Sequence, residues 1–179
     1  MSKRHSGGGS LMVWGGFASK GKTSLCVVPG TMNTVAYITV LSEHLLPHES
    51  KIAGPNWILQ HDNSSCHRAA LKKEFMKENH IRIIGWPAYS PDLNPIENLW
   101  GILARRVYEK GKQYNSIDEL KVAVLEAWNS IEPEILQSLV DSMRREFLML
   151  QANRGLLSII EEKKLEWTYT FEMLKINTL

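Results

Sequence analysis

Two carboxylates, Asp62 and Glu97, stand at positions where acids often do chemistry. Asp62 follows the short apolar run Trp57–Gln60, which predicts a buried strand, and open α/β sheets gather ligand-binding groups at the carboxyl ends of such strands. Glu97 falls in the first turn of a predicted helix. If Trp57–Gln60 and the apolar run Ile81–Trp86 are neighbouring strands, both acids converge at one edge of the sheet. Paired carboxylates are the hard oxygen ligands that Mg²⁺ prefers, and two such ions can drive phosphodiester cleavage.

Each acid has an ordinary structural interpretation as well. Asp62 lies in the sequence His61-Asp62-Asn63 and can simply be the turn residue that ends a strand. Glu97 can be the acidic partner of a helix cap, stabilised by the helix dipole. From spacing alone, both interpretations stay open for both residues.

The segment before Glu97 predicts a rigid support for it. Pro87, Pro91 and Pro95 stand four residues apart, which forbids a helix or a central strand and favours a stiff extended loop. Asn94 is a suitable N-cap, and Pro95 occupies the first helical position, which proline favours. Apolar residues then follow at helical spacing, namely Ile96, Leu99, Trp100, Leu103 and Val107.

The rest of the chain alternates predicted strands and helices. A hairpin is expected near the N-terminus, from Leu11–Ala18 to Thr23–Val28, with a glycine-containing turn between them. Helical spacing and capping signals predict further helices over 33–47, over 67–78, over 116–128 and from Pro133 towards Gly155. This order predicts an α/β fold with one mixed sheet flanked by helices.

Composition excludes several classes of protein. The chain has 179 residues, of which 44% are hydrophobic and 22% charged, and this fits one globular domain rather than a disordered chain. No apolar run approaches the ~18 residues of a membrane span, and two cysteines are too few for a disulfide framework. The start MSKRHSGGGS lacks the apolar core of a secretion signal, so a soluble protein of a reducing compartment is expected.

Charge is distributed unevenly, although 21 basic and 19 acidic residues leave only +2 overall. Residues 1–66 carry +2 (5 − 3), residues 67–112 carry +4 (9 − 5) and residues 113–179 carry −4 (7 − 11). A basic middle is what a phosphate-contacting surface needs, whereas lysines solvated on helix faces explain the same count.

The most specific signal is a pattern longer than any pair of residues. The strings WILQHDNSSCHRA and IIGWPAYSPDLNPIENLWG resemble the catalytic domain of DDE transposases of the Tc/mariner superfamily. The likeness is to the Tc-like branch, whose second and third acids are separated by 34 residues, and here 97 − 62 − 1 = 34. It reaches upstream through GGGSLMVWGGFASKGKTSL and downstream to DSMRREFLMLQANRG, so it covers roughly residues 5–155.

This resemblance implies a ribonuclease-H-like fold and cut-and-paste DNA transposition, with DNA cleavage and integration, in the nucleus. It makes Asp62 the second and Glu97 the third catalytic acid, both of them ligands of Mg²⁺ or Mn²⁺. Transposon-end DNA is the implied partner, a homodimer is an open alternative, and no membrane is involved.

Four polar residues near the acids are further candidates, as supports of the metal ligands or as DNA contacts: Asn63, His67, Arg68 and Arg105. Packing for the first three, and plain solvation for Arg105, are equally open. The set His61, Cys66 and His67 offers three donors and lacks a fourth, which is weak evidence for zinc.

The family's first strand, and the first acid that it carries, have no counterpart in this sequence. No Asp or Glu precedes Glu43, which lies on a predicted helix. Without the carboxylate that is shared between two ions, the chain alone is expected to be inactive or nearly so, although its family is enzymatic. The alternatives are a non-enzymatic DNA-binding or interaction module derived from a transposase, and a truncated product without a selected role.

The same gap affects the sheet, because the missing strand is its central one. Leu11–Ala18 and Trp57–Gln60 would each expose backbone groups unless they pair with one another, with another segment or with a second chain. The tail Glu166–Met173 has strand-like alternation and is our hypothesis for the covering segment. The predicted domains are a flexible lead-in at 1–10, a partial catalytic domain at 11–155 and a divergent tail at 156–179.

Overall fold

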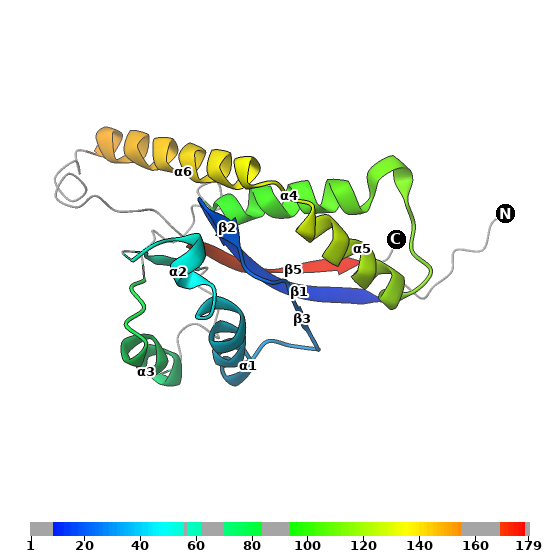
Figure 1. Ribbon diagram of the computed structural model, residues 1–179, viewed down its shortest axis with the longest axis horizontal. Coiled ribbons are helices and arrows are strands. Elements are labelled where there is room, and N and C mark those ends of the chain that lie inside the picture. The colour runs from blue at the N-terminus through cyan, green and yellow to red at the C-terminus, as the bar shows by residue number, and fades with distance from the viewer. Residues whose placement is uncertain (1–8, 56, 62–69, 84–93, 155–168, 178–179) are drawn as a thin grey trace.

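The structure, a computed structural model, describes residues 9–55, 57–61, 70–83, 94–154 and 169–177. Its elements are β1 (Ser10–Ala18), β2 (Gly21–Lys22), β3 (Cys26–Val28), α1 (Thr34–Val40), the π-helix η1 (Leu41–Leu45), α2 (Glu49–Ile52), β4 (Leu59–His61), α3 (Ala70–Glu78), α4 (Pro95–Val107), the 3₁₀ turn η4 (Glu109–Gly111), α5 (Ile117–Asn129), α6 (Pro133–Arg154) and β5 (Tyr169–Asn177). A five-stranded sheet lies between two groups of helices (Figure 1). The predicted α/β architecture is confirmed.

The C-terminal strand β5 lies inside the sheet, in the order β2-β1-β5-β4, while β3 also pairs with β1. β5 runs antiparallel to β1, from the pair Ser10↔Asn177 to the pair Phe17↔Thr170. It runs parallel to β4, from Leu59↔Tyr169 to His61↔Phe171. The hypothesis that the tail covers the sheet is confirmed for Tyr169–Met173, whereas residues 166–168 lie outside the described residues. The strand continues four residues past Met173 and pairs with β1 along its length.

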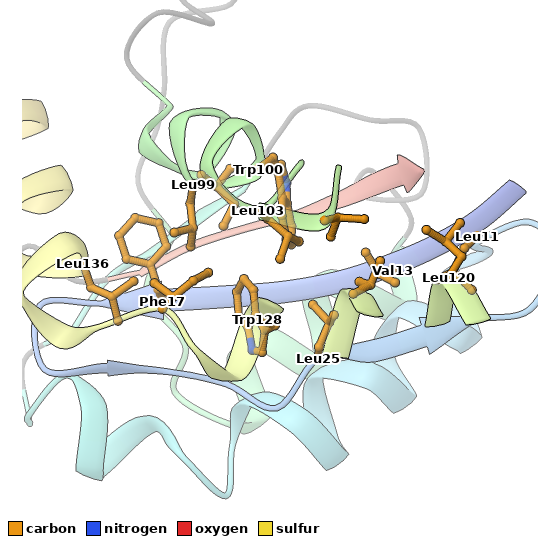
Figure 2. Close-up of a cluster of buried hydrophobic side chains, with 14 of the residues drawn as sticks. Leu11, Val13, Phe17, Leu25, Leu99, Trp100, Leu103, Leu120, Trp128 and Leu136 are labelled. Carbon is orange, nitrogen blue, oxygen red and sulfur yellow. The ribbon is translucent and has the colours of Figure 1, made fainter. Parts of the chain in front are cut away.

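Alternating side chains of β1 serve two separate hydrophobic clusters, as expected for a strand buried on both faces. Leu11, Val13 and Phe17 pack with residues of α4, α5 and α6 (Figure 2). Trp14 and Ala18 pack with residues of α1, η1, α2 and α3 on the other face. Burial of one large apolar side chain stabilises a fold by about 1.5–3 kcal/mol. β1 contributes buried side chains to both clusters and therefore stabilises both helical layers.

The second strand of the predicted hairpin is shorter than expected, with Cys26–Val28 in place of Thr23–Val28. Thr23 is still hydrogen-bonded to β1, because its N–H donates to the Gly16 carbonyl at 2.8 Å. Its own carbonyl, however, accepts the indole N–H of Trp128 at 2.9 Å. A side chain from α5 therefore replaces a continued ladder at this position.

Two further predicted elements differ from the structure. The helix expected over 33–47 begins as the α-helix α1 after Asn33 and continues from Leu41 as the π-helix η1. There the Leu46 N–H donates to the Leu41 carbonyl at 3.0 Å, and both Leu41 and Leu45 are buried. Of the predicted strand Ile81–Trp86, the described part forms only an isolated bridge between Ile83 and Leu59, and 84–86 lie outside the described residues.

Helix α3 turns a different face to the core than the sequence predicts. Helical spacing predicts Leu71 and Met76 on one side of the helix and Lys72 on another. Met76 is buried, but Leu71 is 50% exposed and Lys72 only 1%. Lys72 lies one helical turn before the buried Met76, and its Nζ is 5.2 Å from the centroid of the Tyr37 ring. A cation over an aromatic face is stabilised by the ring quadrupole, so burial of this lysine is compensated.

The later helices agree with the sequence. α5 begins after Ser116, whose hydroxyl accepts the Glu119 N–H at 3.1 Å as in a capping box. The Glu119 carboxylate accepts the N–H of Asn115 rather than that of Ser116. Within the part of the chain that the structure describes, no helix is long and apolar enough to cross a membrane.

Two glycines should respond to alanine in opposite directions. A Cβ at Gly15 would lie 2.9 Å from Leu25 and 3.1 Å from Trp128, so Gly15→Ala should destabilise the fold by about 1–3 kcal/mol. A Cβ on the helical Gly101 meets nothing closer than Arg105 at 3.8 Å, so Gly101→Ala should stabilise it by about 0.5–1 kcal/mol. Urea unfolding of both variants measures this; a Gly15→Ala protein as stable as wild type would contradict the packing described.

The place of β5 can be tested by cross-linking. Met12 and Lys175 are partners in the β1–β5 ladder, and opposed residues of antiparallel strands have Cα atoms ~4.5–5.5 Å apart, within disulfide range. In a chain with Cys26→Ser and Cys66→Ser, the pair Met12→Cys and Lys175→Cys should form an intramolecular disulfide on oxidation. Non-reducing peptide mass spectrometry detects it.

The control for this test replaces Lys175→Cys by Glu78→Cys on α3, and it should stay reduced. Equal cross-linking in both proteins, or none in the first, would remove β5 from its place beside β1.

Candidate metal centre

The carboxylate of Glu97 is free to bind a ligand. Asn94 has the extended backbone of an N-cap, its carbonyl accepts the Glu97 N–H at 3.1 Å, and Pro95 opens the helix as predicted. The Asn94 side chain makes no capping bond, in contrast to the expectation. Glu97 is exposed, and no hydrogen bond or ion pair with another described residue engages its carboxylate.

The helix that carries Glu97 is held firmly. The predicted stripe on α4 is buried throughout, at Ile96, Leu99, Trp100, Leu103 and Val107. The Trp100 ring lies against Trp128 of α5, with centroids 5.5 Å apart and planes inclined at 33°. Figure 2 shows Leu99, Trp100 and Leu103 of α4 together with Trp128 of α5 beside β1. The first turn of α4 therefore has a fixed position relative to the sheet.

The strand β4 leads to the other candidate acid. Leu59 is fully buried, its N–H donates to the Arg82 carbonyl at 2.7 Å, and Gln60 is buried beside it. The strand ends at His61, after which Asp62 is the next residue of the chain. Five residues singled out in the sequence lie outside the described residues: Asp62, Asn63, Cys66, His67 and Arg68.

Arg105 lies on the same side of α4 as Glu97. Glu97, Gly101 and Arg105 are spaced four residues apart, so they form one row along the helix. The guanidinium lies over the glycine, since a Cβ at Gly101 would be 3.8 Å from Arg105 Nη1. Arg105 is exposed, so this row offers a carboxylate and a cation to the same neighbourhood.

The neighbouring Arg106 has a structural role that the sequence did not predict. Its guanidinium donates to the carbonyl and hydroxyl of Ser130 and pairs with the Glu132 carboxylate, which ties α4 to the connection between α5 and α6. The hydrogen bond from Arg106 lowers the pKa of Glu132. Lys22 donates to the Ile131 carbonyl at 2.7 Å in the same connection. No sequence signal separates Arg106 from the adjacent Arg105, because the difference arises from folded neighbours.

The donor atoms of the candidate residues indicate which metal ion they would bind. Among the side chains that the structure describes, no three His, Cys, Asp or Glu gather closely enough to hold a metal ion. Asp62 lies outside the described residues and was therefore not included in this set. The carboxylate oxygens of Glu97 and Asp62 are the hard donors that fit Mg²⁺ or Mn²⁺. The one described thiol, Cys26, is a poor soft ligand, because burial raises its pKa, with Glu43 adding to the effect.

Comparisons with known proteins place this chain in a family. The family model described as DDE superfamily endonuclease matches residues 2–121. The Tc3 transposase of Caenorhabditis elegans is 40% identical over 154 residues, which are 86% of this chain and 47% of that protein. The chain spans about half the length of the curated relatives that it matches.

Solved structures show the same fold at low sequence identity. The Mos1 transposase catalytic domain with raltegravir and Mg has a TM-score of 0.60 at 18% identity, covering 79% of this chain and 73% of that one. The Mos1 paired-end complex with the left transposon end has a TM-score of 0.66 at 17% identity, covering 88% and 46%. The chain therefore belongs to the DDE superfamily endonucleases; it is similar in sequence to the Tc3 transposase and has the ribonuclease-H-like fold of the Mos1 transposase catalytic domain.

Proposed function

We propose that this domain cleaves and joins DNA strands with Mg²⁺ or Mn²⁺ held by Asp62 and Glu97. The observation that carries the proposal is the exposed, unengaged Glu97 carboxylate at the start of a helix buried against the sheet. Asp62 follows the last residue of a strand of that sheet. A bound divalent ion supplies a water of lowered pKa and stabilises charge on the transferring phosphate.

The residues around the two acids have supporting roles in this proposal. Arg105, in one row with Glu97 on α4, contacts a DNA phosphate, since an exposed guanidinium pairs well with phosphate oxygens. Asn63, His67 and Arg68 follow Asp62 closely in the chain and orient it or contact DNA.

Transposon-end DNA in the nucleus is the proposed partner. The Mos1 transposase forms a paired-end complex with its left transposon end, and this supports DNA ends as the ligand of the present domain. A homodimer that holds two ends together is part of the same proposal.

A module that binds DNA without cleaving it is the second candidate. The absence of Asp and Glu before Glu43 favours it, because the upstream part of the sequence then offers no carboxylate to join Asp62 and Glu97. Such a module would retain DNA affinity that falls steeply with salt.

Plasmid nicking separates the two candidates. With Mg²⁺ or Mn²⁺, nicking of supercoiled DNA by the 179-residue chain should be slow, as expected for a site with two acids, and Asp62→Asn and Glu97→Gln should each abolish it, because each removes a metal ligand. Glu78→Gln, an exposed change on α3, is the matched control and should leave the rate unchanged.

Nicking that persists in both acid variants would contradict the proposed site. A salt-dependent gel shift of DNA by a wild-type chain that does not nick would favour the binding module.

The stability of Glu97→Gln tests the plain structural interpretation of this acid. Glu97 is exposed and lies in the first turn of α4, so only its attraction to the helix dipole should be lost, about 0.3–1 kcal/mol. Urea unfolding without metal measures the change. A loss above about 2 kcal/mol would mean that Glu97 mainly holds the fold, and its effect on nicking would then carry no information about the metal.

A further inference from the structure

We propose that the groove between helices α1 and α3 binds a basic amphipathic helix of a partner protein. The two helices lie beside one another on the face of the sheet opposite α4 and α5 (Figure 1). The groove between them has a volume of about 430 Å³. Its main lining residues are Val35 and Ile38 of α1, and Leu71, Glu74, Phe75 and Glu78 of α3.

Exposed apolar side chains of the described part of the chain gather at this groove. Four large apolar residues are strongly exposed there, and two of them, Val35 at 62% and Leu71 at 50%, line the same groove. They belong to two helices that only the fold brings together. Single exposed apolar residues are ordinary, whereas apolar residues gathered in one concave surface are typical of a binding site.

The orientation of α3 supports the same conclusion. This helix buries Lys72 over the Tyr37 ring and leaves the adjacent Leu71 exposed. The opposite arrangement would suit an isolated domain better, because burial of a leucine is favourable and burial of a lysine is costly. Leu71 stands at the start of a row with the spacing i, i+3, i+4 and i+7 that also holds the other groove residues of α3. The exposed leucine is therefore part of a continuous helical surface.

The charge of the groove defines its partner. Glu74 and Glu78 are exposed, stand one helical turn apart and make no hydrogen bond or ion pair with another described residue. Among the described residues, no lysine or arginine lines the groove, and the exposed Lys73 and Lys77 of α3 lie outside its row. A ligand that carries Lys or Arg beside its apolar residues is therefore attracted, and an acidic ligand is repelled.

The walls of the groove favour a helix as the ligand. Both walls are helices, and no residue of a described strand lines the groove. An extended segment would therefore find no sheet edge there with which to pair its backbone. A helix satisfies its own backbone groups, and its side chains at i, i+3, i+4 and i+7 can pack between two other helices.

A second copy of this chain is a poorer occupant. A two-fold contact through the groove would set Glu74 and Glu78 of one chain against the same residues of the other, and like charges repel across an interface. The other described helix with a strongly exposed large apolar residue is α5, where Val122 is 56% exposed. That helix carries three acids and one lysine, so it does not supply the complementary charge.

A designed helical peptide tests the proposal. The probe has about 18 residues, or about five turns, with leucines at i, i+3, i+4 and i+7 and lysines on its other faces. Fluorescence anisotropy measures its binding to the 179-residue chain. Leu71→Ser and Val35→Ser should each weaken binding by about tenfold or more, because each removes an apolar contact. Val122→Ser, a similarly exposed position on α5, is the matched control and should bind as wild type.

Charge reversal separates recognition by this groove from general apolar adhesion. The double variant Glu74→Lys and Glu78→Lys should lose the lysine peptide and bind a peptide in which glutamates replace the lysines, because complementary charge is restored. Glu134→Lys, a change of an exposed acid on α6, is the control and should keep the preference for the lysine peptide. A preference that does not reverse in the double variant would contradict the proposed recognition.

Sedimentation and thermal unfolding test the other possible occupants. Leu71→Ser should leave the oligomeric state and the melting temperature unchanged, because the leucine is exposed. A dimer that this variant dissociates would assign the groove to a second copy, and a large fall in melting temperature would mean that the same chain covers the leucine. Either result overturns the proposal, as does a wild-type chain that does not bind the lysine peptide. The metal site proposed above is tested separately, since α4, which carries Glu97, packs on the other face of the sheet.

Discussion

Backbone pairing in the middle of the sheet is the constraint on which the other features depend. β1 pairs with β2 and β3 along one side, and among the described strands β4 is joined to β1 through β5. A buried N–H or carbonyl without a partner costs about 1–3 kcal/mol, and a row of them along β1 would exceed the margin of an ordinary domain. The strand β5 removes this cost on two neighbours at once, and it also fixes the distance between the layers built on β1 and the end of β4.

The contact between Trp100 and Trp128 holds α4, which carries Glu97, in a fixed position relative to the sheet. Trp128 packs beside Gly15, donates its indole N–H to the Thr23 carbonyl and stacks on Trp100. Through these contacts, α4 is held against the same strand that β5 covers. The first turn of α4, which carries the exposed Glu97, is thus positioned by contacts that are buried. A functional group can then remain free in solvent without being loosely placed.

Local patterns predicted the parts of this structure that depend on neighbours in sequence. The proline-pinned start of α4, its buried stripe and the Ser116 cap follow from spacing and residue type, and the SPDLNPIENLW string indicated the family. Long-range contacts decided the rest. The burial of Lys72 depends on Tyr37, the shortening of β3 on Trp128, and the role of Arg106 on Ser130 and Glu132. Strand alternation predicted the strand in the tail, but no local pattern says which strands it will pair with.

The direction of β5 matters more than its place in the chain. β5 runs antiparallel to β1 and parallel to β4, so its residues follow those of β4 in the same order towards the edge where β4 ends. Chain length allows a C-terminal segment to meet this need. Helix α6 has 22 residues, about 33 Å, and the fourteen residues 155–168 can span up to about 50 Å, enough to return along it. A sheet position is therefore defined by the pairing that its neighbours require, whichever segment of the chain supplies the strand.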